Sequence, residues 1–338
     1  MSSYFNLYGN IFVVKGNKES IIYDLGNQNY YSLPNDIADV LLKIEKEELS
    51  IDKLRKIYGK KYNDVKKLLK YFVEKNLAQF VSNPKSFPKI GLEWHSPYKI
   101  VNAIVEFNNA CKYNVIEVLH QLEALGCQAI EFRFIDKLNK DYISKILDEF
   151  LNSSFKYYLI ASKYNENIST EKYKTFAYKY KRISRLLVFV ENSVKFYDKL
   201  KKSQPSKPKV IFINRNLGFK MGEKITLNSF VINIPSFAEA RSHNIGLNRK
   251  VCIDSNGDIR NFLTHRKTYG NVNDEKIKDI IDLSNFQYKW NISNNKIQKC
   301  KDCQYRYMCL SNSDIIEKNG KFYKVDICNF NPYTNKWE

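Results

Sequence analysis

Six apolar runs typical of β-strands recur between residues 100 and 234, and helical stretches separate most of them. The runs are IVNAIVEF (100–107), QAIEFRF (128–134), KYYLIA (156–161), LLVFVE (186–191), KVIFIN (209–214) and SFVINI (229–234). Between them, residues 114–125 and 141–151 carry apolar side chains at helical spacing. Strands that alternate with helices pair in parallel, so the pattern predicts an α/β fold whose parallel sheet is open or closed as a partial barrel.

A different pattern occupies residues 10–81. Two strands, IFVV and SIIYDL (20–25), flank a turn at Gly16-Asn17 and predict a β-hairpin. Three helical stretches follow, which begin near Pro34, Ser50 and Asn63, and LAQFV (77–81) predicts a returning strand. A hairpin, three helices and one more strand form a small winged helix-turn-helix. Such a unit binds DNA or receives a peptide as an added strand.

Residues 81–98 contain three prolines and little periodicity, which predicts a linker. Within it, Glu93, Trp94 and His95 form a candidate cleft edge. The predicted domains are therefore a winged-helix domain (1–85), the α/β region (98–245) and a cysteine-rich C-terminal module (246–338). A chain of 338 residues is longer than one ordinary core requires, which agrees with this division.

The composition sets limits on compartment and partners. No signal peptide and no apolar run near 18 residues is visible, so we expect no membrane segment and a cytoplasmic protein. The net charge is +19, but 45 of the 55 basic residues are lysines spread along the chain. We therefore expect no dedicated nucleic-acid site, whereas an acidic peptide partner is compatible with this charge.

Clustered cysteines in a cytoplasmic protein more often bind metal than form disulfides. Three of them, Cys300, Cys303 and Cys309, form the motif C-x2-C-x5-C. Between Cys309 and the fourth, Cys328, lie 18 residues, which is enough for a hairpin to bring Cys328 back to the other three. Two thiolates on one tight turn, with two more from neighbouring segments, complete a closed four-sulfur site. The alternative is four buried thiols without metal, which the surrounding Lys, Asp and Gln residues make less attractive.

The same motif resembles the second half of the SPASM domain, the auxiliary iron–sulfur module of many radical S-adenosylmethionine peptide-modifying enzymes. More specifically, CKDCQYRYMC (300–309) and DICNFNPYTNKW (326–337) resemble the SPASM protein of grasp-with-spasm systems. There it accompanies an ATP-grasp ligase and a short precursor peptide. The resemblance implies a winged-helix peptide-recognition domain, a degenerate radical-SAM-like partial (β/α)6 barrel and a SPASM-like module.

The sequence departs from that family where radical chemistry would occur. A working enzyme needs C-x3-C-x2-C after the first barrel strand, but here the loop supplies only Cys111, and Val115 and Val118 stand at the other two positions. The next cysteine, Cys127, precedes the second strand and is expected in the core. We therefore expect neither use of S-adenosylmethionine nor a ligand role for Cys111.

The SPASM resemblance also departs from a full two-cluster module, because the first cluster keeps only Cys252. The three cysteines of the C-x2-C-x5-C motif, together with Cys328, match the four ligands of the second cluster. We expect one [4Fe–4S] cluster there, with Zn²⁺ as the alternative, since four thiolates suit both.

Other catalytic patterns are weak. The four histidines, His95, His120, His243 and His265, show no metal-ligand spacing, and no catalytic residue is assigned. His120 is expected to pack on its helix.

The resemblance implies maturation of a ribosomally synthesised peptide, with the precursor peptide and an ATP-grasp ligase as partners. Two alternatives stay open: an enzyme acting on that peptide by another route, and a winged-helix DNA-binding regulator with a metal module. For the peptide, we predict an added strand beside residues 20–25 and the third helix, with five candidate contact residues: Ile21, Tyr23, Lys66, Leu69 and Lys70.

Overall fold

The computed structural model describes residues 3–190, 209–215, 217, 225–326 and 328–338. Its largest element is a seven-stranded sheet in the order β10-β9-β8-β7-β6-β11-β12, which makes the protein a mixed α/β fold. Neighbouring strands are parallel except that β12 is antiparallel to β11. The strands are β6 (Asn102–Phe107), β7 (Ala129–Lys137), β8 (Tyr157–Lys163), β9 (Ile183–Phe189), β10 (Val210–Ile213), β11 (Lys250–Ile253) and β12 (Ile259–Arg260).

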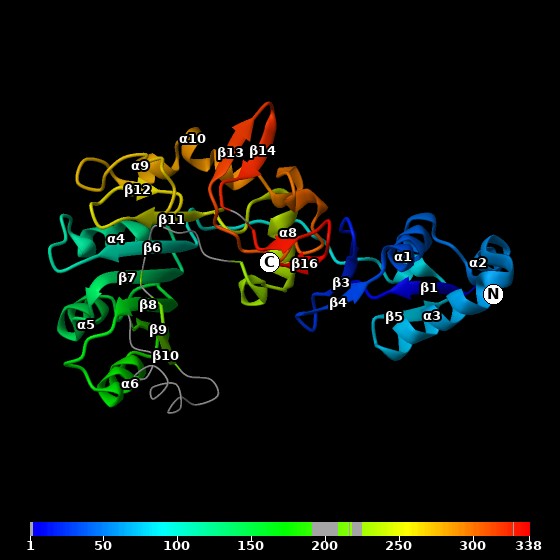
Figure 1. Cartoon of the computed structure of the whole chain (residues 1–338), viewed down its shortest axis with the longest axis horizontal. Helices are drawn as coiled ribbons and strands as arrows, with labels where there is room; N and C mark the ends of the chain where they lie inside the picture. Colours follow the sequence, from blue (N-terminus) through cyan, green and yellow to red (C-terminus); the bar gives the residue numbers. More distant parts are fainter. Residues whose placement is uncertain (1–2, 191–208, 216, 218–224, 327) are drawn as a thin grey trace.

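Strands β6 to β10 lie side by side in chain order, and the connections from β6 to β9 contain α4 (Val115–Ala124), α5 (Lys140–Glu149) and α6 (Thr170–Lys179). Connections of one hand that always add the next strand on the same side place their helices on one face of the sheet. Figure 1 shows α4, α5 and α6 along one side of the sheet. Helices and strands share one apolar core that includes Phe107, Phe132 and Leu122.

Five of the six predicted strands are confirmed, although residue 191 of the fourth lies outside the described residues. The sixth prediction, residues 229–234, is wrong. There the chain forms a short 3-10 turn (Leu227–Ser229) and then enters α8 (Ile234–Ser242). The Asn233 side chain accepts a hydrogen bond from Ser236 N, and Pro235 occupies the first turn, so a helix start ends the apolar run.

The predicted helices of the first region are confirmed as α1 (Asn35–Glu47), α2 (Ile51–Tyr58) and α3 (Tyr62–Glu74). Ser50 caps α2 by accepting a hydrogen bond from Lys53 N, and Gly59 ends it with a φ of +47°. The third helix begins at Tyr62, so Asn63, near which the sequence predicts the start, lies inside the first turn and does not cap the helix.

The strands of the first region differ from the prediction. The hairpin β2 (Ile11–Val14) and β3 (Ser20–Asp24) is present, but β4 (Asn29–Leu33) pairs with the other side of β3. The returning strand, β5 (Ala78–Val81), pairs with β1 (Tyr4–Leu7) and not with the hairpin. The region therefore holds a three-stranded sheet, β2-β3-β4, and a separate two-stranded sheet, β1-β5.

The last third of the chain continues the large sheet before it forms smaller units. Strand β11 pairs with β6, so the segment predicted as a separate module shares the α/β sheet. The segment DSNG (254–257) forms the turn between β11 and β12, with Gly257 at a φ of +89°. The remaining elements are α9 (Ile277–Ile281), α10 (Ser284–Gln287), β13 (Ile315–Lys318), β14 (Lys321–Lys324), β15 (Phe330–Asn331) and β16 (Lys336–Trp337). Among the described residues, no helix is long and apolar enough to span a membrane.

A candidate four-cysteine metal centre

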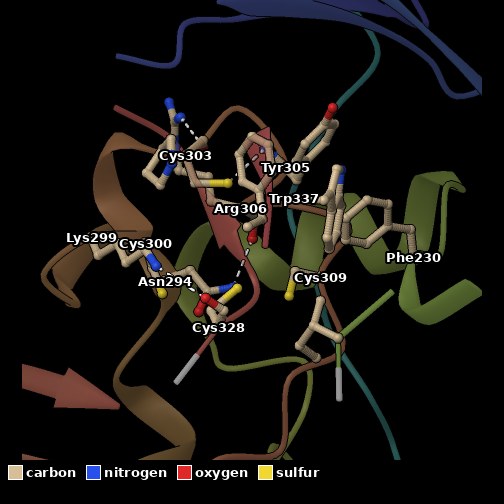
Figure 2. Close-up of a pocket in the computed structure, with 13 residues that line it drawn as sticks. Phe230, Asn294, Lys299, Cys300, Cys303, Tyr305, Arg306, Cys309, Cys328 and Trp337 are labelled. Carbon is tan, nitrogen blue, oxygen red and sulfur yellow. Dashed lines mark hydrogen bonds between the residues drawn. The ribbon is translucent and has the colours of Figure 1, made fainter. Parts of the chain in front are cut away.

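Three separate pieces of the C-terminal chain bring four cysteines to one cavity. Cys300 opens a 3-10 turn (Cys300–Asp302), and Cys303 follows directly after it. Cys309 forms an isolated β-bridge with Phe230, which fixes the next segment. Figure 2 shows the sulfurs of these three residues and of Cys328 around the same space, and all four line one cavity.

The hairpin predicted to return Cys328 is present as β13 and β14. Asn319 and Gly320 form its turn, with φ values of +50° and +68°, the left-handed conformations that a tight two-residue hairpin requires. The C-x2-C-x5-C motif and the distant cysteine therefore converge as the spacing predicts.

Aromatic rings form one wall of this cavity, which holds about 420 Å³ of empty space, part of it open to solvent. The Tyr305 ring stacks on Phe230 at 4.9 Å between centroids and meets Phe330 edge-on at the same distance. Trp337 packs against Phe330 at 5.1 Å. An apolar wall around thiols keeps water from them and lowers the local dielectric.

Burial controls the charge of these thiols. It raises the pKa of Cys300 and Cys303 well above the ordinary value and that of Cys309 to about 11, and neighbouring thiols raise all three further. The ammonium of Lys324 opposes this for Cys300 and Cys309. Without metal these groups are neutral thiols at pH 7, so a metal would displace their protons on binding.

The donor set fits a four-thiolate centre. The Tyr305 backbone N–H donates to Cys303 Sγ at 3.4 Å, and the Ser311 backbone lowers the pKa of Cys309 through a hydrogen bond. Such N–H groups stabilise a thiolate that binds metal. However, no three His, Cys, Asp or Glu side chains within the described ranges already gather tightly enough to hold one ion. The sulfurs thus share a cavity without meeting at a single point.

The other three cysteines lie elsewhere. Cys252 is buried on β11, where its thiol contacts Asn261 O at 3.7 Å and burial raises its pKa to about 12. Cys127 is fully buried, as predicted for a core residue, and burial raises its pKa to about 12 as well. Cys111 is half-buried in the loop after β6.

The predicted peptide contacts do not form one groove. Ile21 and Tyr23 have fully buried side chains on β3, and β2 and β4 occupy both edges of that strand. Strand addition beside residues 20–25 is therefore wrong, because no free edge exists there. Leu69 is buried in the core of the first region, and only Lys66 and Lys70 are exposed, on α3.

The histidines have structural surroundings. His120 is exposed and packs on the Phe150 ring at 4.9 Å, in line with the packing expected of it. His265 is buried and donates from Nε2 to Asn312 O at 2.9 Å. The three residues of the candidate cleft edge, Glu93, Trp94 and His95, line a shallow cavity together with His243.

Sequence reasoning missed the aromatic wall. Tyr305 lies two residues after the predicted ligand Cys303, and Trp337 lies in the motif that carries the resemblance, so both had a local signal. Phe230 had none, because only the bridge to Cys309 brings it there. In comparisons with known proteins, no family model and no curated protein matches this chain.

Proposed function

We propose that this protein matures a ribosomally synthesised peptide by binding the precursor and acting alongside an ATP-grasp ligase. The observation that carries the proposal is the gathering of Cys300, Cys303, Cys309 and Cys328 around one cavity, since these are the residues that resemble the SPASM proteins of grasp-with-spasm systems. The proposed fold is a degenerate radical-SAM-like partial barrel between a winged-helix peptide-recognition domain and a SPASM-like module. Chain-order parallel pairing with helices on one face supports the barrel.

The β6–α4 loop supports a role without radical chemistry. Val115 and Val118, which stand where two further cluster ligands would be required, lie on α4 and are buried in the core of the large sheet. Their side chains therefore hold the helix against the sheet, and Cys111 alone cannot hold a cluster that leaves an iron open for S-adenosylmethionine.

The resemblance to the SPASM module favours a [4Fe–4S] cluster over zinc at the C-terminal centre. Four thiolates suit both metals, and all four cysteines line the cavity that either centre would fill. When bound, the cluster supplies a closed structural or electron-transfer centre with no open coordination position.

The free edge of β4 is the best-supported place for the precursor peptide. Strand β4 is the outer strand of the β2-β3-β4 sheet, and Tyr31 on it is 39% exposed. The opposite edge differs, because the Lys89 ammonium donates to Ile11 O of β2 at 2.5 Å and the linker runs beside it. An edge strand offers its backbone N–H and C=O groups to an extended peptide.

The metal assignment is tested by anaerobic purification of the wild type and of Cys303→Ser and Cys252→Ser variants. Because Cys303 lines the cavity and Cys252 does not, we expect Cys303→Ser to lose most of its iron and sulfide. Cys252→Ser, which also changes a buried cysteine, is the matched control and should retain both. Undiminished metal in Cys303→Ser, or zinc without sulfide in the wild type, would contradict the cluster proposal.

A further inference from the structure

The turn that carries Cys300 and Cys303 is also the surface on which the N-terminal sheet rests. Tyr23 Oη on β3 donates to Gln304 O at 2.9 Å, and Asn17 N in the β2–β3 turn donates to Asp302 O at 2.7 Å. In the opposite direction, Arg306 Nη1 of the C-terminal region donates to Lys15 O at 2.6 Å. Every group on the C-terminal side of these bonds lies within three residues of Cys303.

Close packing makes this contact specific. A Cβ atom on Gly16 would stand 2.7 Å from Gln304 Oε1, so the turn needs glycine to reach the cysteine segment. Gln304 Nε2 donates to Asn335 Oδ1 at 2.7 Å, and Asn335 Nδ2 donates to Glu19 Oε2 at 2.9 Å. This chain of polar contacts ties the hairpin to two separate parts of the C-terminal region.

The aromatic wall of the cavity continues into the N-terminal sheet. Tyr305, which stacks on Phe230 inside the cavity, meets the Tyr30 ring of β4 edge-on at 5.9 Å. Tyr23 packs against Phe237 of α8 at 4.9 Å and is fully buried. Its burial raises the pKa of its hydroxyl, which therefore stays protonated as the donor to Gln304 O.

We propose that metal binding at the four cysteines fixes the N-terminal sheet in place, so that metal affinity and the order of β2, β3 and β4 are thermodynamically coupled. The inference rests on the metal centre proposed above. A small cysteine-rich segment has little core of its own and depends on its metal for order. Since Asp302, Gln304 and Arg306 all lie between Cys300 and Cys309, ordering the ligands orders the atoms that hold the sheet. Coupling of this kind is reciprocal, so loosening the sheet must weaken metal binding by the same factor.

The first test measures metal affinity in the full-length protein by chelator competition under anaerobic conditions. Tyr23→Phe keeps the ring and removes the hydroxyl, and we expect the affinity for the metal to fall by up to about fivefold, the worth of one buried hydrogen bond. Tyr157→Phe makes the same change at an exposed tyrosine on β8 of the large sheet and should leave the affinity unchanged. An unchanged affinity in Tyr23→Phe would overturn the coupling.

The second test compares amide hydrogen exchange in the full-length wild type before and after the metal is removed by a chelator. We expect residues 11–24 to lose protection together with residues 300–309, while residues 129–163 of the large sheet keep theirs. If residues 300–309 lose protection and residues 11–24 do not, the coupling is wrong and the metal centre stands. A purified chain that binds no metal at all overturns both proposals.

Discussion

At the scale of single residues, burial and the neighbouring groups decide the protonation state of several polar side chains. Burial raises the pKa of Cys300, Cys303 and Cys309 and keeps these thiols uncharged at pH 7, and Tyr23 is a buried hydroxyl with a backbone acceptor. His265 belongs to the same class. Its ring is 2% exposed, and Nδ1 lies 3.6 Å from Asp314 Oδ1, but that carboxylate is already paired with the Lys289 ammonium.

The surroundings of His265 predict a pH dependence of stability. Burial holds the pKa of His265 below its usual range, and Asp314 only partly opposes this. Below about pH 6.5 the unfolded chain therefore takes up a proton that the folded chain refuses, and the free energy of unfolding falls as the pH falls. It stops falling once the pH is below the folded pKa.

Urea unfolding at pH 7.5 and 5.5 checks this. The loss of stability between the two values should be smaller in His265→Gln, which keeps an amide donor for Asn312 O, than in the wild type. His120→Gln, on an exposed histidine, should lose as much as the wild type. Taking differences cancels the other titrating groups. Equal losses in wild type and His265→Gln would contradict the prediction.

At the scale of elements, local signals predicted well and long-range pairing did not. Ser50 and Asn114 were readable as helix starts because each side chain bonds a backbone N–H two or three residues ahead. The pairing of β1 with β5 joins residues more than seventy positions apart, and nothing in the sequence near Tyr4 announces it. Strand β4 was also missed, although it pairs with β3 across a short turn, and it is the strand that forms the outer edge of that sheet.

The position of β4 predicts how proline affects peptide binding. Successive N–H groups of an edge strand point alternately toward the sheet and away from it. Of the variants Tyr31→Pro and Ser32→Pro, one should therefore break a bond to β3 and lower the melting temperature. The other should remove only an outward N–H group. We expect the second to weaken binding of the precursor peptide severalfold at unchanged stability, measured by fluorescence titration. If neither proline affects peptide binding, the β4 edge is not the site.

The β6–α4 loop makes a prediction about reactivity. Because Cys111 is its only cysteine, reduced and reconstituted protein should form no 5′-deoxyadenosine from S-adenosylmethionine. Chromatography of the reaction against a protein-free control measures this, and Cys111→Ala should have unchanged metal content. Formation of the product above the control would mean that an open iron exists somewhere in the chain.

At the scale of the whole molecule, the gathering of the four cysteines around one cavity was predictable because the cysteines and the hairpin between them are encoded within forty residues. Its contact with β2 and β3 was not, since Tyr23 and Gln304 are 281 positions apart. That contact has a practical consequence. Residues 1–85 alone would expose the face of Tyr23 and Ile21 that the C-terminal region covers, so binding must be measured with the full chain.

The net charge of +19 would attract either an acidic peptide or a DNA duplex, and the two ligands differ in how salt changes their affinity. Exposed lysines such as Lys66 and Lys70 attract acidic groups on a peptide, but each exposed ion pair contributes less than about 1 kcal/mol. Backbone pairing and apolar contacts should dominate peptide binding, so raising the salt concentration should weaken it only moderately. A duplex behaves differently, because neutralised phosphates release counterions and the affinity falls steeply with salt.

Titrating the full chain with a fluorescent precursor peptide and with a random DNA duplex, each at about 50 and about 200 mM salt, separates the two cases. Between these salt concentrations, a protein that makes six to ten phosphate contacts loses roughly 10³-fold or more of its duplex affinity. We expect the peptide to bind with a shallow salt dependence and the duplex to bind weakly. Lys66→Gln with Lys70→Gln should reduce peptide affinity only slightly, because these lysines act through screened charge. Tight duplex binding with a steep salt dependence, and no peptide binding, would instead make the first region a DNA-binding winged helix.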